Sequence, residues 1–185
     1  MPKDKMPHEA LRLDIHQIRT NAREQMAAGA VTAAYRADRE AVISVLNDAL
    51  ATEIVCMLRY KNHHFMAAGI HAQSIAQEFL EHANEELGHA DAIAARINQL
   101  GGIPNFNPDG LVTRSHSEYQ QGTTIESMIR ENLVSERIAI ETYSAIVRWL
   151  GDDDSTTRRL IEDILKMEEE HADDLANLMK GIAKG

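Results

Sequence analysis

The sequence has 185 residues with a formal net charge of −10, 44% hydrophobic residues and only 4% aromatic residues. This length allows one domain with a sizeable core, and the helix-forming composition, poor in strand formers, predicts an all-α fold. The acidic balance argues against a generally basic nucleic-acid surface and favours cationic partners such as metal ions. Because Cys56 is the only cysteine, an intrachain disulfide and a cysteine-rich zinc or rubredoxin-type site are excluded.

The N-terminal segment is predicted to contain a helix over about residues 8–28, ended by Gly29. Its basic and acidic residues nearly cancel, so it lacks the cationic character of a DNA-binding arm. The first residues lack the apolar core of a secretory signal, and no apolar run approaches the roughly 18 residues of a membrane span. We therefore expect a soluble, cytoplasmic protein in which residues 1–35 form an N-terminal helical extension.

Four long segments with helical periodicity follow, at about 36–68, 72–100, 124–150 and 155–182. The first and third connections are short, as in antiparallel helix hairpins, whereas the middle connection, 101–123, has about twenty residues. A helix of about 28 residues is roughly 42 Å long, and an extended connection of this length covers that distance. Thr123 with Glu126 resembles a capping box at the start of the third segment. Residues 36–185 are thus predicted to form a four-helix bundle of two antiparallel hairpins joined by a long crossover.

The two hairpins carry an internal repeat. L-A-T-E in the first and L-V-S-E in the second each lead, after six residues, to a tyrosine, and E-L-G-H-A-D later matches E-E-E-H-A-D. The repeated positions are Glu53 and Glu136, Tyr60 and Tyr143, Glu86 and Glu168, and His89 and His171. Such matching predicts two hairpins related by an approximate two-fold axis, which would bring the repeated polar groups together at one centre.

The repeated acids and histidines interrupt apolar stripes at helical spacing, for example Leu133, Glu136 and Ile140 in the third segment. Four buried carboxylates cannot all stay ionised without compensation, which two divalent cations would supply, with two imidazoles as neutral ligands. The E-x-x-H spacing places both side chains on adjacent turns of one helix face, so they can bind the same ion. The sequence predicts a di-metal site formed by Glu53, Glu86, His89, Glu136, Glu168 and His171.

One Glu from each of two helices and E-x-x-H from each of the others is the ligand pattern of ferritin-like di-iron proteins. Over about 36–180 the chain resembles bacterioferritin and the related Dps-like ferritins, notably in A-T-E-I-V-C-M-L-R-Y and H-A-D-A-I-A-A-R-I-N-Q-L-G-G-I-P-N-F. The resemblance implies two iron ions per chain, although oxygen and imidazole ligands also suit manganese. It implies terminal ligands Glu53 and His89 for one iron, terminal ligands Glu136 and His171 for the other, and bridging Glu86 and Glu168.

The sequence differs from bacterioferritin and its relatives in three features, which change what is expected for haem, shell size and a cysteine pair. Leu87 occupies the position of the haem-ligating methionine, so no haem is expected there. The sequence ends soon after the fourth segment, without the fifth helix of 24-subunit ferritins, which favours a Dps-like shell of 12 subunits. Cys56 has no partner for the cysteine pair that some Dps-like members, the thioferritins, carry near their metals.

Tyr60 matches the family's site-adjacent tyrosine, and the resemblance implies a catalytic role for it as a hydrogen-bond or electron donor. A core tyrosine bonded to a neighbouring ligand is the alternative for Tyr60 and Tyr143. Four further histidines are interpreted as surface or core residues, with a role in iron entry or transfer as the alternative: His63, His64, His71 and His82. Acids off the stripes, Glu85 and Asp174 among them, are interpreted as solvated.

The resemblance implies a di-iron ferroxidase that oxidises Fe(II) with O2 or H2O2 and stores Fe(III) inside a homo-oligomeric shell. Two alternatives remain open. One is a di-iron or di-manganese peroxidase or catalase without storage. The other is a Dps-type protein that protects DNA, which the acidic charge makes the weaker alternative.

Overall fold

The computed structural model describes residues 10–69 and 72–182, which contain helices and no strand. The helices are α1 (Ile15–Glu24), α2 (Arg39–Met66), α3 (Ala72–Gln99), α4 (Leu111–Arg114), α5 (Ile125–Leu150) and α6 (Ser155–Ile182), with a 3-10 turn at Met26–Ala28. The chain forms two compact units, one that ends at Tyr35 and one that begins at Arg36. The predicted all-α class is confirmed.

The helix of the N-terminal unit is shorter than predicted. It begins at Ile15, where the side chain of Asp14 accepts a hydrogen bond from the backbone N–H of Gln17 and caps the first turn. Residues 10–14 are not helical, and residues 8 and 9 lie outside the described part of the chain. After Glu24 the chain continues through the 3-10 turn to Gly29, which has a positive φ of 62°.

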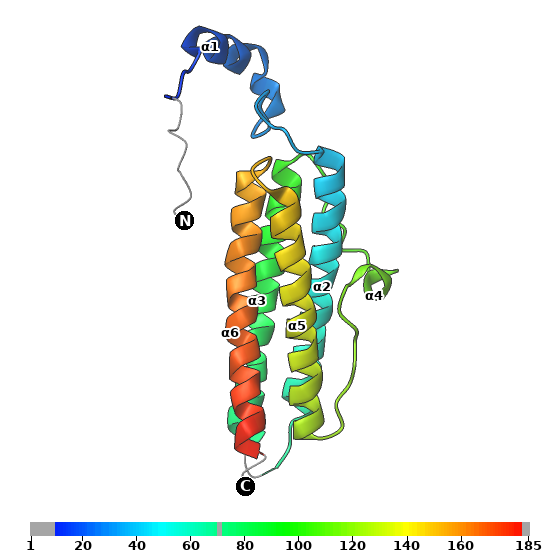
Figure 1. The fold of residues 1–185 in the computed structure, drawn as a ribbon. Coiled ribbons are helices and arrows are strands. Elements are labelled where there is room, and N and C mark those ends of the chain that lie inside the picture. Colours follow the sequence, from blue (N-terminus) through cyan, green and yellow to red (C-terminus); the bar gives the residue numbers. More distant parts are fainter. Residues whose placement is uncertain (1–9, 70–71, 183–185) are drawn as a thin grey trace, which may run out of the picture. The chain divides into compact units, whose positions relative to one another are not determined.

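The second unit is a four-helix bundle in which α2, α3, α5 and α6 lie side by side (Figure 1). α2 packs along α3 and α5 along α6, and the two pairs meet through α2 against α5 and α3 against α6. Their buried faces carry the apolar residues that the helical periodicity predicts, such as Leu46, Phe79, Ile129 and Leu175. The predicted bundle of two antiparallel hairpins is therefore confirmed.

α2 is long and apolar enough to cross a membrane by length and composition, although half of the apolar stretch is buried in the bundle. Its buried residues include the charged side chains Glu53 and Arg59. Because charged groups are buried only where they find partners, this helix has the character of a core helix of the bundle.

The long crossover is held against α2 and α5 by a buried arginine. Arg59 donates to the side chain of Asn132 at 3.0 Å and to the carbonyl of Glu118 at 3.0 Å. The backbone N–H of Gly122 donates to His63 Nε2 at 3.0 Å, so His63 Nδ1 carries the proton and donates to Asn132. These bonds fix the path by which the chain returns to start the second hairpin.

Two details of the crossover differ from expectation. The short helix α4 interrupts it and contacts α2, with Leu111 packed against Ala51 and Val55. The capping box of α5 is formed by Thr124 and Ser127 instead of the predicted Thr123 and Glu126. The Ser127 hydroxyl accepts a hydrogen bond from the backbone N–H of Thr124 and donates one to its carbonyl. The usual capping box has Glu or Gln at this position, so the sequence pattern did not predict a serine there.

Candidate metal centre

The six predicted ligands all lie on the inner faces of the bundle helices. Glu53 is in α2, Glu136 in α5, and the two E-x-x-H pairs are in α3 and α6. Each of the four glutamates is 1% exposed and His171 is 2% exposed, whereas the His89 side chain is 12% exposed. Helical periodicity positions them, because each occupies a place in an apolar stripe that faces the other three helices.

The structure brings these residues together as two overlapping groups. Each group offers four ligand atoms that lie within 4.8 Å of one another. The first consists of Glu53, Glu86, His89 and Glu168, and the second of Glu86, Glu136, Glu168 and His171. Only Glu86 and Glu168 belong to both groups, so the geometry has two adjacent positions with two shared carboxylates.

Both histidines turn Nδ1 towards the carboxylates. His89 Nδ1 lies 3.2 Å from Glu53 Oε2 and 3.4 Å from Glu86 Oε2. It is also 3.1 Å from Glu168 Oε1, but that oxygen has no hydrogen bond, so the contact is not aligned for one. His171 Nδ1 lies 3.6 Å from Glu86 Oε1 and 3.5 Å from Glu168 Oε2.

Several buried polar atoms at this centre have no hydrogen-bond partner. They are Glu86 Oε1, Glu136 Oε2, Glu168 Oε1, Glu168 Oε2 and His171 Nδ1. A buried polar atom without a partner destabilises a fold by about 1–3 kcal/mol, so such a concentration calls for an explanation. Carboxylate oxygens and imidazole nitrogens aimed at common points fit divalent iron or manganese, which would satisfy them together.

The pKa values show that the buried carboxylates compete for positive charge. Burial and repulsion by neighbouring carboxylates raise the pKa of Glu53 and of Glu136 well above the usual value. Burial alone would lower the pKa of His171, but the neighbouring carboxylates raise this pKa to about 11. The carboxylates around His89 likewise raise the pKa of His89 against the effect of its burial. Burial alone would raise the pKa of Glu86, but the two histidines lower it. Protons therefore occupy the place that cations would take.

Two buried tyrosines cross-link the hairpins at the centre. The hydroxyl of Tyr60 on α2 hydrogen-bonds to Glu136 on α5, and that of Tyr143 on α5 hydrogen-bonds to Glu53 on α2. Each tyrosine thus holds the glutamate of the other hairpin, which is the reciprocal contact expected from an approximate two-fold axis. Both side chains are 0% exposed.

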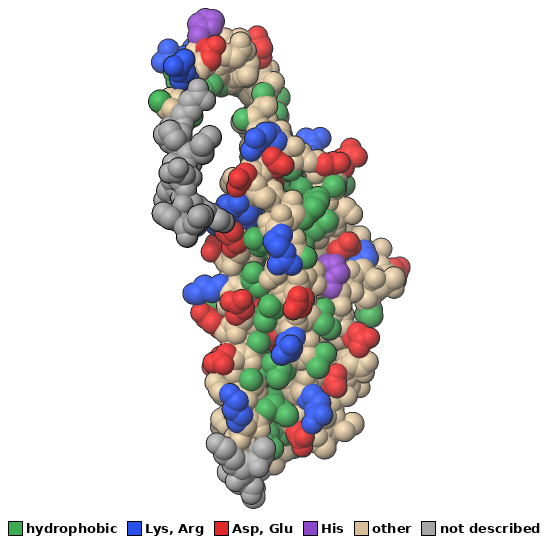
Figure 2. Space-filling view, viewed as in Figure 1, with side chains coloured by type: hydrophobic (Ala, Val, Ile, Leu, Met, Phe, Trp, Pro, Cys, Tyr) green, Lys and Arg blue, Asp and Glu red, His purple; other side chains and the backbone are tan. Residues whose placement is uncertain are grey.

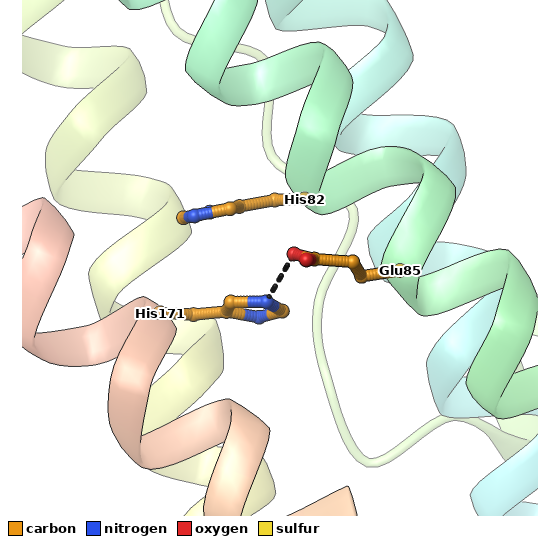
Figure 3. Close-up of side chains that lie close together, drawn as sticks. All are labelled: His82, Glu85 and His171. Atoms are coloured by element: carbon orange, nitrogen blue, oxygen red, sulfur yellow. Dashed lines mark hydrogen bonds and ion pairs between the residues drawn. The ribbon is translucent and has the colours of Figure 1, made fainter.

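Two further residues at the centre were not predicted as part of it. Glu85 accepts a hydrogen bond from His171 Nε2 at 2.8 Å, and the ring of His82 stacks on that of His171 with centroids 4.1 Å apart (Figure 3). Burial, with repulsion by His171, lowers the pKa of His82 to about 4, so its imidazole is neutral. Both residues lie close in sequence to the E-x-x-H motif of α3, which could have suggested that they are near the centre. Sequence position alone does not reveal that they contact His171 on α6.

His63 and His64, which were interpreted as surface or core residues, have local contacts. His63 is the buried partner of Asn132 and Gly122, and His64 Nδ1 lies 2.7 Å from the carbonyl of Ala76. His71 lies outside the described residues.

Comparison with known proteins places this geometry in a family. Residues 43–184, most of the chain, match the ferritin-like domain. The chain belongs to the ferritin-like family. Within this family, a bacterioferritin from Desulfovibrio desulfuricans is 31% identical over 138 residues, which cover 74% of this chain and 73% of that protein. A nutrient stress-induced DNA-binding protein from Nostoc is 32% identical over 139 residues, which cover 72% of this chain and 74% of that protein.

Solved structures of ferritin-like proteins agree with the fold. The dodecameric thioferritin of Bacteroides fragilis, a bacterioferritin-related protein, is 32% identical with a TM-score of 0.77, over 80% of this chain and 90% of that one. The Desulfovibrio desulfuricans bacterioferritin, whose diiron site was described in different catalytic states, is 29% identical with a TM-score of 0.69, over 80% of this chain and 84% of that one. Relatives with a diiron site, together with the acidic and histidine groups of this chain, indicate iron binding.

Proposed function

We propose that this chain is a ferroxidase that binds two Fe(II) ions as substrate, oxidises them and stores the Fe(III) product inside a homo-oligomeric shell. The observation that carries the proposal is the pair of four-residue groups that share Glu86 and Glu168. The unpartnered buried oxygens of these two residues and of Glu136 support the binding of cations.

In this proposal each hairpin supplies the terminal ligands of one position. Glu53 and His89 hold one Fe(II), Glu136 and His171 hold the other, and the carboxylates of Glu86 and Glu168 bridge them. Each Fe(II) gives up one electron. The two electrons and two protons reduce one O2 to H2O2, or one H2O2 to two water molecules. Two adjacent positions suit this reaction because the oxidant accepts electrons in a pair.

Tyr60 and Tyr143 act on the centre through the glutamates that they hold. Their hydroxyl groups bond to Glu136 and Glu53, one terminal ligand at each position. Hydrogen bonds to the ligands of a metal hold those ligands in the orientation that binding requires. We propose that Tyr60 contributes to the reaction as the hydrogen-bond donor that holds Glu136 in place, because its buried hydroxyl contacts that carboxylate directly.

Storage requires assembly, and the bundle has a surface suited to it. Figure 2 shows apolar side chains among the charged ones along the length of the bundle. On α5, Val134 is 47% exposed and Trp149 is 52% exposed, and Trp149 lines a groove with Val45 of α2. The Bacteroides relative is dodecameric, and we propose a shell of 12 copies for this chain, in the cytoplasm.

Oxidation of Fe(II) in air by the purified protein tests the proposal. The wild type should oxidise Fe(II) much faster than Glu86→Ala, which loses a shared carboxylate, or His171→Ala, which loses a ligand of one position. Equal rates in all three proteins would show that the centre does not catalyse the reaction. A wild type that turns over H2O2 but retains no ferric mineral would favour the peroxidase or catalase alternative.

DNA protection is a second candidate function, favoured by the name of the Nostoc relative, a DNA-binding protein. The net charge of −10 opposes it, because binding to phosphates relies on lysine and arginine. It is compatible with ferroxidase activity, since the two functions would use different surfaces.

A further inference from the structure

Among the residues that the structure describes, two arginines are buried, and they differ in their partners. Arg96 on α3 is 8% exposed, and its Nη2 lies 2.9 Å and 3.2 Å from the two carboxylate oxygens of Asp154. Arg59 on α2 is 0% exposed, has no ion pair within residues 10–69 and 72–182, and leaves its Nη2 without a hydrogen-bond partner. Its hydrogen bonds go to neutral oxygen atoms, which are Asn132 Oδ1, Ser117 Oγ and the carbonyl of Glu118. Because a buried charge is costly unless an opposite charge offsets it, the partner of Arg59 must act from further away.

Tyr60 connects Arg59 to the metal centre. The guanidinium carbon of Arg59 lies 5.8 Å from the centre of the Tyr60 ring, and the hydroxyl of the same ring bonds to Glu136. The guanidinium is therefore within roughly 11 Å of the Glu136 carboxylate. All three side chains are buried, so water and salt screen this attraction little. A guanidinium keeps its charge at any ordinary pH, and the centre thus has a fixed positive charge beside it.

The internal repeat shows that this charge is on one side of the centre. Tyr60 corresponds to Tyr143, so the residue before it, Arg59, corresponds to Thr142 in the second hairpin. A threonine carries no charge. At this position of the repeat the positive charge therefore lies beside the tyrosine that holds Glu136 and is absent beside the tyrosine of the other hairpin.

A fixed positive charge distinguishes between ions of different charge. The four carboxylates of the centre balance two divalent ions, whereas two trivalent ions bring two further positive charges. At roughly 10 Å and an effective dielectric constant of about 20, one further unit of positive charge lowers a binding constant by about tenfold. Arg59 therefore opposes a trivalent ion more strongly than a divalent ion, and most strongly at the position that Glu136 serves.

We infer that Arg59 determines the charge selectivity of the centre: its buried guanidinium disfavours trivalent ions at the position of Glu136 and His171, so that Fe(III) leaves this position first. The inference rests on the proposed function, because it takes Fe(II) as the substrate and Fe(III) as the product. A centre that kept its product bound would stop after one turnover, so weaker binding of Fe(III) favours repeated oxidation. Arg59 acts here through its charge, apart from the hydrogen bonds by which it holds the crossover.

The ratio of the Ga(III) binding constant to the Co(II) binding constant tests this role. Co(II) is not oxidised by air under mild conditions, and Ga(III) has the charge and nearly the size of Fe(III) without its redox chemistry. Both ions are titrated into the metal-free full chain from nitrilotriacetate buffers. Arg59→Gln removes the charge, keeps a polar side chain and should raise the ratio by about tenfold. Arg59→Lys keeps the charge and should leave the ratio as in the wild type.

Arg96→Gln is the matched control, because it also removes a buried arginine, but one whose charge Asp154 offsets. Its ratio should equal that of the wild type. Equal ratios in the wild type and Arg59→Gln would overturn the inference. A rise of the same size in Arg59→Lys would also overturn it, since the effect would then come from lost hydrogen bonds. Fewer than two Co(II) per wild-type chain would instead contradict the two-metal centre of the proposed function.

Crystals of the wild type test the same charge without a substitution that could disturb the crossover. At partial loading, Ga(III) should occupy the position of Glu53 and His89 more fully than that of Glu136 and His171, and Co(II) should show this preference less. Anomalous scattering at the absorption edges of the two metals measures both distributions. Equal distributions of Ga(III) and Co(II) would overturn the inference even if Arg59→Gln failed to fold.

Discussion

The carboxylate of Glu85 determines which nitrogen of His171 faces the centre. Because Glu85 accepts the proton of Nε2 at 2.8 Å, Nδ1 is left to point at Glu86 and Glu168. Carboxylates that hold a ligating histidine in this way commonly contribute 10–100-fold to metal affinity.

We predict that Glu85→Ala lowers the affinity of the centre for Co(II) by about tenfold or more, for this reason. Glu85→Gln should lose less, since its amide oxygen can accept the same hydrogen bond. Glu81→Ala is the control, because Glu81 is an exposed acid on the same helix that accepts a hydrogen bond from the side chain of Gln77. If Glu85→Ala and Glu81→Ala bind Co(II) equally well, Glu85 does not position His171.

Metal uptake should also release protons. The pKa of His171 is raised to about 11, and those of Glu53 and Glu136 are raised well above the usual value, so these groups hold protons that a metal must displace. Lower pH therefore opposes binding, and affinity should fall by about tenfold per pH unit for each proton released. Titration of Co(II) into weakly buffered protein, with pH recorded, measures the release. An affinity that is constant between pH 6 and pH 8 would contradict it.

Helical periodicity allowed the six residues of the centre to be predicted, because each replaces an apolar residue in a stripe that must face the core. The structure brings them together, while their assignment as ligands remains a prediction. His82 lies on the same stripe as Glu86, but it was interpreted as a surface or core histidine and left out of the predicted centre. Glu85 could not be predicted in the same way. Glu85 precedes Glu86 by one residue and so lies off the stripe, and its importance comes from a contact with α6, which sequence position does not reveal.

At the scale of elements, Gly122 permits the crossover to approach α5. A Cβ atom there would lie 2.5 Å from Met128 Cγ and 2.6 Å from the Met128 backbone nitrogen. The helix backbone cannot yield to this contact, and the N–H of Gly122 also holds His63.

Gly122→Ala should therefore lower the free energy of unfolding by about 1–3 kcal/mol. Gly88→Ala is the contrasting variant, because Gly88 is inside α3 with no atom within 4 Å of an added Cβ. It should raise the free energy of unfolding by about 0.5–1 kcal/mol, since alanine is the better helix former. Urea unfolding of both variants measures the difference. A Gly122→Ala protein as stable as the wild type would show that the close approach is not maintained in solution.

The helices of the bundle were predicted to within about three residues at each end, because long amphipathic segments bounded by glycine have few alternatives. The ends themselves depend on single side chains. Asp14 caps α1, which starts several residues later than predicted, and Ser127 with Thr124 starts α5. The helix α4 has only four residues, too few for a periodic signal, and its place depends on packing against α2.

At the scale of the whole molecule, the proposed shell predicts a mass. Twelve chains of 20.6 kDa should give a particle of about 247 kDa in light scattering. A monomer or small oligomer would contradict storage inside a shell and would favour a peroxidase or catalase.

DNA binding should be absent or weak in the assembled protein. A gel shift at moderate salt, with the full chain and with a variant that lacks residues 1–30, should show little retention of DNA in either case, because of the acidic charge. Retention that depends on residues 1–30 and falls steeply with salt would instead support a DNA-coating role for the N-terminal unit.

The most direct test of the centre is the amount of iron oxidised in the fast first phase when protein loaded with Fe(II) without oxygen is mixed with O2. The account predicts two Fe(II) per chain in this phase for the wild type and none for Glu86→Ala, because loss of a shared carboxylate damages both positions. One Fe(II) per chain, or a fast phase of equal size in Glu86→Ala, would contradict a two-iron centre bridged by Glu86 and Glu168.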